Sequence, residues 1–139
     1  MTVIDVGSGP PLVLIPGVQG RWEWMRPAVE ALAAECRVLT FSLDDEVKDF
    51  AGLVDQVRDA LDASGVERAA ICGVSYGGLI AAAFATQYPE RTAALVLVSA
   101  LPPRWQPDAR VRFYLRAPRL LAPLLDRKST RLNSSHTDI

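Results

Sequence analysis

Short apolar runs alternate with stretches of helical periodicity along the first hundred residues, and this alternation constrains the fold more than any other feature. The apolar runs end at proline, glycine or polar residues, as is typical of strands buried on both faces of a sheet. Apolar residues between them recur at helical spacing. We predict strands over 12–15, 37–41, 69–72 and 94–98, and helices over 23–35, 49–63 and 76–87.

Strands that alternate with helices indicate an α/β fold, in which crossover helices connect the strands of a mostly parallel sheet. Residues 2–6 could add a short edge strand, and Gly65 is the expected end of the second helix. The first helix is expected to bury one face, made up of Met25, Ala28, Val29 and Leu32. The second helix is also expected to bury one face, made up of Phe50, Leu53, Val54, Val57 and Leu61.

Length and charge exclude several classes of protein. The chain has 139 residues, enough for one domain, and a net charge of −1, which argues against a nucleic-acid partner. Its two cysteines form no metal-binding or redox motif, so we expect reduced thiols. The N-terminus lacks a signal-peptide pattern and no apolar run could cross a membrane. We therefore expect a cytoplasmic protein with neither a metal ion nor a cofactor.

The motif Gly73-Val74-Ser75-Tyr76-Gly77 lies where a predicted buried strand meets a predicted apolar helix. A G-x-S-x-G sequence in this setting is typical of a nucleophile elbow, a sharp turn that lifts the serine hydroxyl out of the sheet. The structural elbow glycines, Gly73 and Gly77, are expected because a Cβ there would collide with the neighbouring strand or helix. We predict Ser75 as a catalytic nucleophile; an incidental serine in a tight turn is the alternative.

A second glycine-rich segment, 16–20, follows the first predicted strand. Backbone N–H groups from such a loop and from the residue after the nucleophile form an oxyanion hole in proteins with this elbow. By position in the motifs, Val18 and Tyr76 are the predicted donors. An ordinary glycine-rich connection is the alternative for the loop.

These residues resemble the α/β-hydrolase superfamily, in its esterase and lyase-like branch. The resemblance covers residues 7–103 and is carried by GSGPPLVLIPGVQGRWEW and GVSYGGLIAAAFATQYPERTAALVLVSALPP. It implies a serine hydrolase that cleaves a small ester, thioester or similar acyl substrate. Two departures stand out: Pro16-Gly17 replaces His-Gly, and residues 42–45 replace an Asp-x-Arg-Gly-x-Gly loop.

The resemblance also implies a catalytic acid and then a histidine after later strands. Nothing between 104 and 125 has the pattern of such a strand, so we expect both groups to be missing and the chain to be inactive or nearly so. His136 is the single histidine, and no strand precedes it. Some family members carry their acid near the position of Asp108, but we interpret Asp108, like Asp44 and Asp45, as a solvated carboxylate.

Two segments follow the predicted core of residues 1–103. Residues 104–125 contain five arginines among aromatic and leucine residues and are predicted to begin a cap over the site. Alternatively, this arginine-rich segment binds an anionic substrate or a membrane surface, or forms a solvated face. Residues 126–139 have no apolar period, and 126–136 resemble one reading frame of a common short-read sequencing adapter. We interpret 126–139 as an artefactual or disordered tail.

Two other functions are alternatives to the hydrolase. A non-catalytic hydrolase-like binding protein would keep the fold without the reaction. A nucleotide-binding domain is disfavoured because the chain contains neither G-x-G-x-x-G nor G-x-x-x-x-G-K-[ST]. If the strand over 94–98 has no neighbour, its apolar edge predicts poor solubility. The substrate and the oligomeric state are left open by the sequence.

Overall fold

The computed structural model describes residues 1–47, 49–100 and 109. All but residue 109 belong to one compact unit, Met1–Pro103. The predictions made for 104–125, 126–139, Asp108 and His136 lie outside the described residues. The elements in chain order are β1 (Val3–Val6), β2 (Pro11–Ile15), the 3₁₀ helix η1 (Trp22–Met25), α1 (Arg26–Leu32), β3 (Arg37–Phe41), α2 (Phe50–Ala63), β4 (Ala69–Val74), α3 (Tyr76–Gln87), the 3₁₀ helix η2 (Pro89–Arg91) and β5 (Thr92–Val98).

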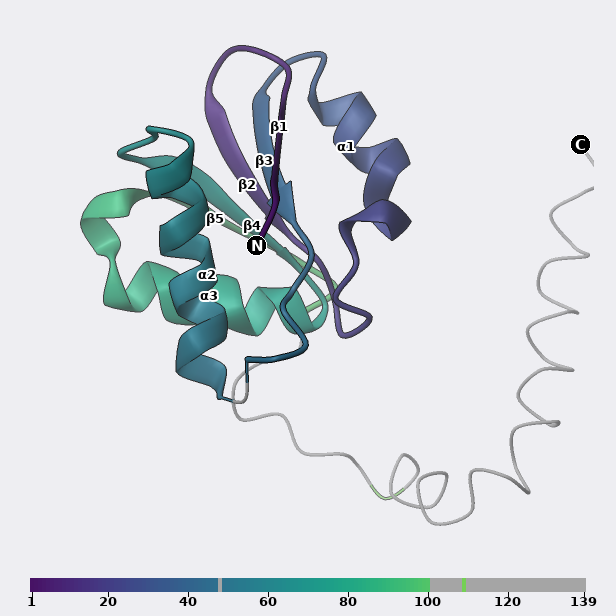
Figure 1. Ribbon diagram of the computed structural model, residues 1–139, viewed down its shortest axis with the longest axis vertical. Helices are drawn as coiled ribbons and strands as arrows, with labels where there is room; N and C mark the ends of the chain where they lie inside the picture. The colour runs from purple at the N-terminus through teal and green to yellow at the C-terminus, as the bar shows by residue number, and fades with distance from the viewer. Residues whose placement is uncertain (48, 101–108, 110–139) are drawn as a thin grey trace, which may run out of the picture. The chain divides into compact units, whose positions relative to one another are not determined.

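The five strands form one sheet in the order β1-β3-β2-β4-β5 (Figure 1). Strands β2, β3, β4 and β5 pair in parallel, and β1 pairs antiparallel with β3 at one edge. The predicted α/β fold with a mostly parallel sheet is confirmed, including the short edge strand near the N-terminus.

Helices cover both faces of the sheet, with α1 on one side and α2 and α3 on the other (Figure 1). Side chains of a strand alternate between the two faces. Accordingly Val13 and Ile15 join the core cluster under α2 and α3, whereas Leu14 joins the cluster with Val29 of α1. Because both faces are covered, the central strands are continuous apolar runs, which is why the sequence shows them clearly.

The prediction for the first helix was wrong in its bounds and in one buried residue. A 3₁₀ turn occupies 22–25, and α1 ends at Leu32, whose carbonyl oxygen accepts hydrogen bonds from the N–H groups of Glu35 and Cys36 at 3.0 and 2.9 Å. This turn brings the chain directly into β3. Val29 is buried as expected, but Ala28 is exposed, because the core cluster on this face of the sheet includes Val29, Met25 and Leu32 and leaves Ala28 out.

Helix α2 matches its prediction at both ends, and only its first residue departs from the expected core. The side chain of Asp49 accepts a hydrogen bond from the Gly52 N–H at 2.7 Å and caps the helix. Gly65 has a φ of 62°, as a residue that ends a helix in the left-handed region requires. Phe50 was expected in the core but is 42% exposed. Its ring packs edge-on against the ring of Tyr76.

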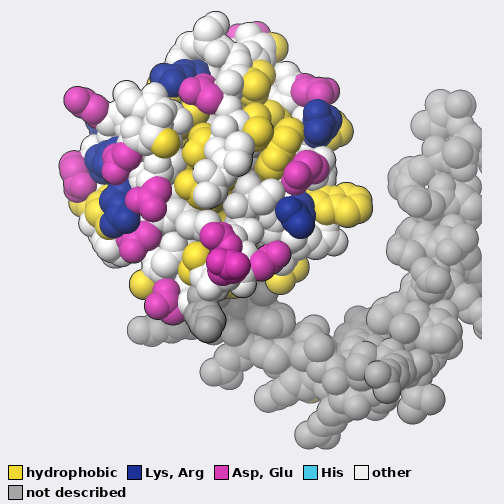
Figure 2. All heavy atoms as spheres, in the orientation of Figure 1, with side chains coloured by type: hydrophobic (Ala, Val, Ile, Leu, Met, Phe, Trp, Pro, Cys, Tyr) yellow, Lys and Arg dark blue, Asp and Glu magenta, His cyan; other side chains and the backbone are white. Residues whose placement is uncertain are grey.

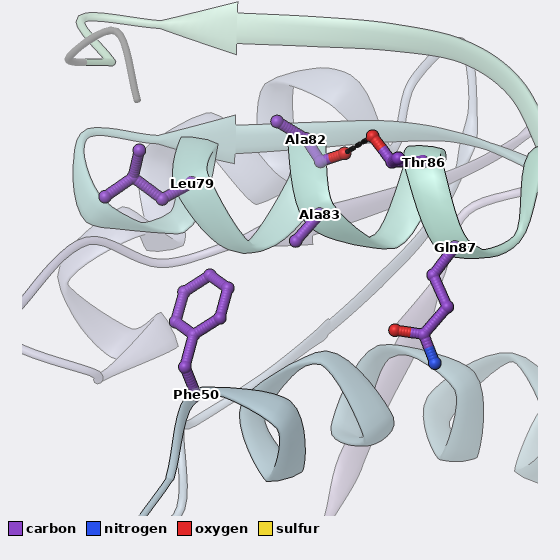
Figure 3. A pocket seen from close by; sticks show the side chains of 6 residues that line it. All are labelled: Phe50, Leu79, Ala82, Ala83, Thr86 and Gln87. Atoms are coloured by element: carbon purple, nitrogen blue, oxygen red, sulfur yellow. Dashed lines mark hydrogen bonds between the residues drawn. The ribbon is translucent and has the colours of Figure 1, made fainter. Parts of the chain in front are cut away.

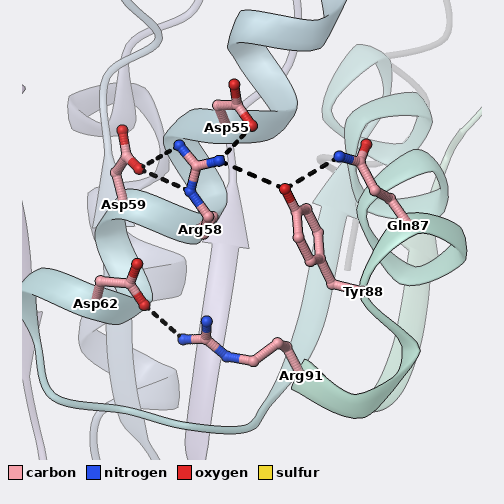
Figure 4. A network of polar contacts seen from close by, with 7 residues as sticks. All are labelled: Asp55, Arg58, Asp59, Asp62, Gln87, Tyr88 and Arg91. Carbon is pink, nitrogen blue, oxygen red and sulfur yellow. Dashed lines mark hydrogen bonds and ion pairs between the residues drawn. The ribbon is translucent and has the colours of Figure 1, made fainter.

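Polar side chains join α2 to η2 (Figure 4). Arg91 donates to Asp62 at 2.8 Å and to the carbonyl oxygens of Glu67 and Val66 at 2.6 and 3.1 Å. Arg58 forms ion pairs with two carboxylates of its own helix and donates to the Tyr88 hydroxyl at 3.5 Å. The chain that leaves α3 is therefore fixed to α2 before it enters β5.

Strand β5 is the least covered strand of the described sheet. Its residues 93–98 are all exposed, with Leu97 at 51%. Elsewhere the surface carries mixed charge: on the face that Figure 2 shows, basic and acidic side chains are interspersed and form no basic stripe.

Candidate active site

The strand order places the segment after β2 beside the segment after β4. From β2 the chain moves to β3 on one side, and from β4 it moves to β5 on the other, so the crossover direction reverses between β2 and β4. Ligands of parallel α/β sheets bind outside the carboxyl ends of the strands at such a switch point. Ile15 pairs with Gly73, which puts residues 16 and 17 next to residues 74 and 75.

Ser75 occupies the corner between β4 and α3 in a strained main-chain conformation. Its φ is 52° and its ψ is −115°, values that non-glycine residues rarely adopt. The Ser75 N–H donates to the carbonyl oxygen of Val98 at 2.8 Å, and the Ser75 carbonyl oxygen accepts from the Gly78 N–H at 3.0 Å. The residue is exposed, and its hydroxyl makes no hydrogen bond with another described residue. The hydroxyl is thus positioned by the backbone and open to a ligand.

Both predicted elbow glycines are required by close backbone approaches. A Cβ on Gly73 would collide with the carbonyl group of Gly77 and with Gly78 Cα. A Cβ on Gly77 would collide with the carbonyl oxygens of Ile15 and Pro16. The first turn of α3 can therefore pack against the ends of β2 and β4 only without side chains at these two positions.

The loop of residues 16–20 lies directly against the Ser75 corner. A Cβ on Gly17 would stand 3.5 Å from Ser75 Cβ, and the loop is closed by a 2.9 Å hydrogen bond from the Gly20 N–H to the Gly17 carbonyl oxygen. Within the described part of the chain, neither the Val18 N–H nor the Tyr76 N–H donates a backbone hydrogen bond. The two predicted oxyanion donors are thus on the segments that meet at Ser75. The side chain of Val18 is 79% exposed.

No acid or base accompanies Ser75 among residues 1–47, 49–100 and 109. This part of the chain contains no histidine, and His136 and Asp108 lie outside it. Asp44 and Asp45 are exposed, as expected of solvated carboxylates. The Asp44 side chain accepts from the Glu46 N–H at 2.9 Å and so shapes its own loop.

Phe50 is a residue near the site that the sequence did not reveal. Its ring lies edge-on to the Tyr76 ring, with 6.4 Å between centroids. The two positions are far apart in the chain, and no periodic pattern connects them. Their contact follows from the crossing of α2 and α3, which only the structure shows.

The described residues show few features of other kinds of functional site. They contain no group of three metal-ligating side chains and no helix long and apolar enough to cross a membrane. Cys36 and Cys72 are both free thiols. Burial raises the pKa of the Cys72 thiol, which keeps it protonated and unreactive.

Comparison with known proteins identifies the family to which the chain belongs. The family model described as alpha/beta hydrolase fold matches residues 45–135. The chain is 33% identical over 107 residues to the 2-hydroxy-6-oxo-6-phenylhexa-2,4-dienoate hydrolase of Burkholderia cepacia, covering 68% of this chain and 37% of that protein. It is 32% identical over 97 residues to the poly(3-hydroxyalkanoate) depolymerase of Ectopseudomonas oleovorans, covering 64% and 34%.

Solved structures agree with the sequence relatives. A point mutant of the meta-cleavage product hydrolase CumD superposes with a TM-score of 0.65 and 31% identity, covering 75% of this chain and 43% of that one. The naproxen esterase of Bacillus subtilis shares the fold with a TM-score of 0.69 at 21% identity, covering 83% and 44%. The chain spans 34–40% of the length of the curated relatives it matches. It belongs to the family with the alpha/beta hydrolase fold.

Proposed function

We propose that this chain carries the nucleophile of a serine hydrolase that cleaves small esters or similar acyl substrates through an acyl-Ser75 intermediate. The observation that carries the proposal is the main-chain conformation of Ser75, strained at the switch point of the sheet with its hydroxyl exposed. Strained residues persist where the surrounding structure holds them, and they cluster at active sites.

In the proposed reaction, Ser75 Oγ attacks the carbonyl carbon and the carbonyl oxygen becomes an oxyanion. The N–H groups of Val18 and Tyr76 donate hydrogen bonds to this oxyanion. The N-terminus of α3 adds a favourable dipole beside the developing charge. Since serine is a weak nucleophile without a base, the described residues alone are expected to show only residual activity.

The substrate class rests on the relatives as well as on the site. Their names describe a dienoate hydrolase and a poly(3-hydroxyalkanoate) depolymerase. An exposed serine hydroxyl, at a corner where two N–H groups have no backbone partner among the described residues, suits attack on the carbonyl carbon of an acyl substrate. We further propose that the substrate is a small acyl compound and that the protein is cytoplasmic.

The test is covalent labelling of the chain with a fluorescent alkyl fluorophosphonate, followed by mass-spectrometric mapping. Because the described residues supply no base, slow labelling of Ser75 over hours, and its loss in Ser75→Ala, is the expected result. Ser99→Ala is the matched control, because Ser99 is also an exposed serine with positive φ at the end of a strand. Equal labelling of Ser75→Ala and the unchanged chain would refute the assignment.

The oxyanion donors have their own test. Val18→Pro removes the N–H and is expected to slow labelling by about 10²–10³-fold, whereas Val18→Ala keeps the N–H and should label like the unchanged chain. Equal rates for the two variants would remove Val18 from the proposed site.

A non-catalytic binding protein is the second candidate, favoured by the absence of a histidine from the described residues. It predicts that the chain binds acyl compounds at the Ser75 corner while Ser75 resists the phosphonate. The labelling experiment therefore separates the two candidates.

A further inference from the structure

A groove runs between α2 and α3, outside the Ser75 corner (Figure 3). It has a volume of about 520 Å³, within the range typical of small-molecule sites. One wall is the ring of Phe50, which points from the start of α2 toward α3. The other lining residues all belong to α3: Leu79, Ala82, Ala83, Thr86 and Gln87.

The groove exists because α3 is apolar on two faces. Ile80, Ala81 and Phe84 are buried against the sheet. The lining positions 79, 82, 83 and 86 recur at helical spacing outside this buried face, with Ala83 at its border against the core, and they too are apolar except for Thr86. A helix that is apolar all round is normally covered, so this outer face is suited to contact with an apolar molecule.

Polar atoms occur at one end of the groove only. The Thr86 hydroxyl donates to the Ala82 carbonyl oxygen at 2.8 Å, which leaves its oxygen able to accept a hydrogen bond. The Gln87 side-chain N–H donates to the Tyr88 hydroxyl at 3.0 Å, and its carbonyl oxygen makes no hydrogen bond with another described residue. This end therefore offers two acceptor oxygens to a ligand, and the second N–H of the Gln87 amide remains able to donate.

The charges near this end disfavour an anionic ligand. None of the six lining side chains is charged. Arg58 donates a hydrogen bond to the Tyr88 hydroxyl, next to Gln87. It already forms ion pairs with Asp55 and Asp59 at 2.9 and 2.8 Å. Two exposed carboxylates therefore already pair this guanidinium, so it is not available to pair with a carboxylate head group in the groove.

We infer that this groove binds an uncharged amphiphile: an aliphatic alcohol whose chain lies over Ala82 and Ala83 toward Phe50, and whose hydroxyl donates to Thr86 or Gln87. Phe50 also packs edge-on against Tyr76, so the wall of the groove contacts the residue after Ser75. The inference rests on the groove itself and does not depend on Ser75 being a nucleophile.

The experiment is photoaffinity labelling of the 139-residue chain with an aliphatic alcohol that carries a diazirine, followed by tryptic mapping. The groove lies in the peptides of residues 49–58 and 69–91, whereas exposed β5 lies in the peptide of residues 92–104. We expect the label in the first two peptides. Competition should require about tenfold more octanoate than 1-octanol, because burying a charge is costly. Labelling mainly in 92–104, or equal competition by both compounds, would overturn the inference.

Two variants and one control make the test specific. Ala83→Trp fills the groove and should reduce labelling of residues 69–91 by about tenfold, a loss comparable with that of a good apolar contact. Ala31→Trp adds the same side chain at an exposed position of α1 and should label normally. Phe50→Ala, which leaves α3 unchanged, should also weaken labelling and gives a second reading if Ala83→Trp does not fold. Unchanged labelling in Phe50→Ala would likewise contradict the site.

Discussion

Gly77 lies against the carbonyl group of Ile15 so closely that a Cβ would stand 2.5 Å from its oxygen. We predict that Gly77→Ala lowers the free energy of unfolding by about 3 kcal/mol, because α3 or β2 must shift to admit the methyl group. Gly65→Ala is the comparison: Gly65 has a φ of 62° but no atom within 4 Å of the added Cβ. That variant should cost about 1 kcal/mol, from backbone strain alone. Urea denaturation measures both, and equal losses would contradict the close approach.

Replacing Ser75 by glycine is expected to stabilise the protein. Its φ of 52° is strained for serine and allowed for glycine, so Ser75→Gly should raise the free energy of unfolding by about 1 kcal/mol. Ser75→Ala keeps the Cβ and should bring no such gain. Chemical denaturation of the two variants decides between them. A gain in Ser75→Ala as large as in Ser75→Gly would show that the side chain, and not the backbone, is the source of strain.

Arg91 and Asp62 form an ion pair whose two members should contribute unequally. Arg91 also donates to two backbone carbonyl oxygens, so Arg91→Ala is predicted to cost about 2 kcal/mol. Asp62 is an exposed partner, and Asp62→Ala should cost about 0.5 kcal/mol or less. Thermal or urea unfolding gives both values. A larger loss from the Asp62 variant would mean that the charge pair, and not the carbonyl contacts, fixes η2 to α2.

The ion pair of Asp5 and Arg37 should make stability depend on acidity. Two hydrogen bonds from Arg37, at 3.0 and 2.6 Å, lower the pKa of Asp5 below its ordinary value of 3.8. A carboxyl whose folded pKa is lowered stabilises the fold above its unfolded pKa, and this contribution is lost as the pH falls through the folded value. The stability difference between the unchanged chain and Asp5→Asn should therefore be largest above pH 3.8 and shrink below it. Urea midpoints across that range measure it, and a constant difference would exclude the linkage.

Strand β5 should make the chain self-associate. It has no charged or proline residue that would protect an exposed strand, and Leu97 is half exposed. Leu97→Lys is predicted to shift the chain toward monomer in sedimentation velocity with little change in circular dichroism. Val6→Lys, at an exposed apolar residue of β1, is the control and should associate like the unchanged chain. A monomeric unchanged chain at the same concentration would contradict the prediction.

The sequence predicted those helices and strands whose ends are set by local signals and not by tertiary packing. The helix over 76–87 has the bounds of α3, because the Ser75 corner and Pro89 mark its ends. The helix over 23–35 failed, because apolar spacing does not reveal the turn that carries the chain from Leu32 into β3. Strand order was likewise outside its reach, since the reversal between β2 and β4 depends on how whole units pack.

The candidate site divides in the same way. Ser75, its flanking glycines and the loop of 16–20 are recognisable as motifs, because close backbone approaches demand glycine at fixed spacing. The contact between Phe50 and Tyr76, and the groove beside it, result from the crossing of two helices. The local sequence of neither helix predicts the contact between them.

Among the described residues, the contacts that hold the Ser75 corner come from the main chain: a carbonyl oxygen of β5, an N–H of α3 and the backbone of the loop after β2. The side chains around it can therefore change without displacing the hydroxyl. In the proposed enzyme, substrate selectivity could therefore change through side-chain substitutions, while the position of the nucleophile depends on a backbone that requires glycine at positions 73 and 77.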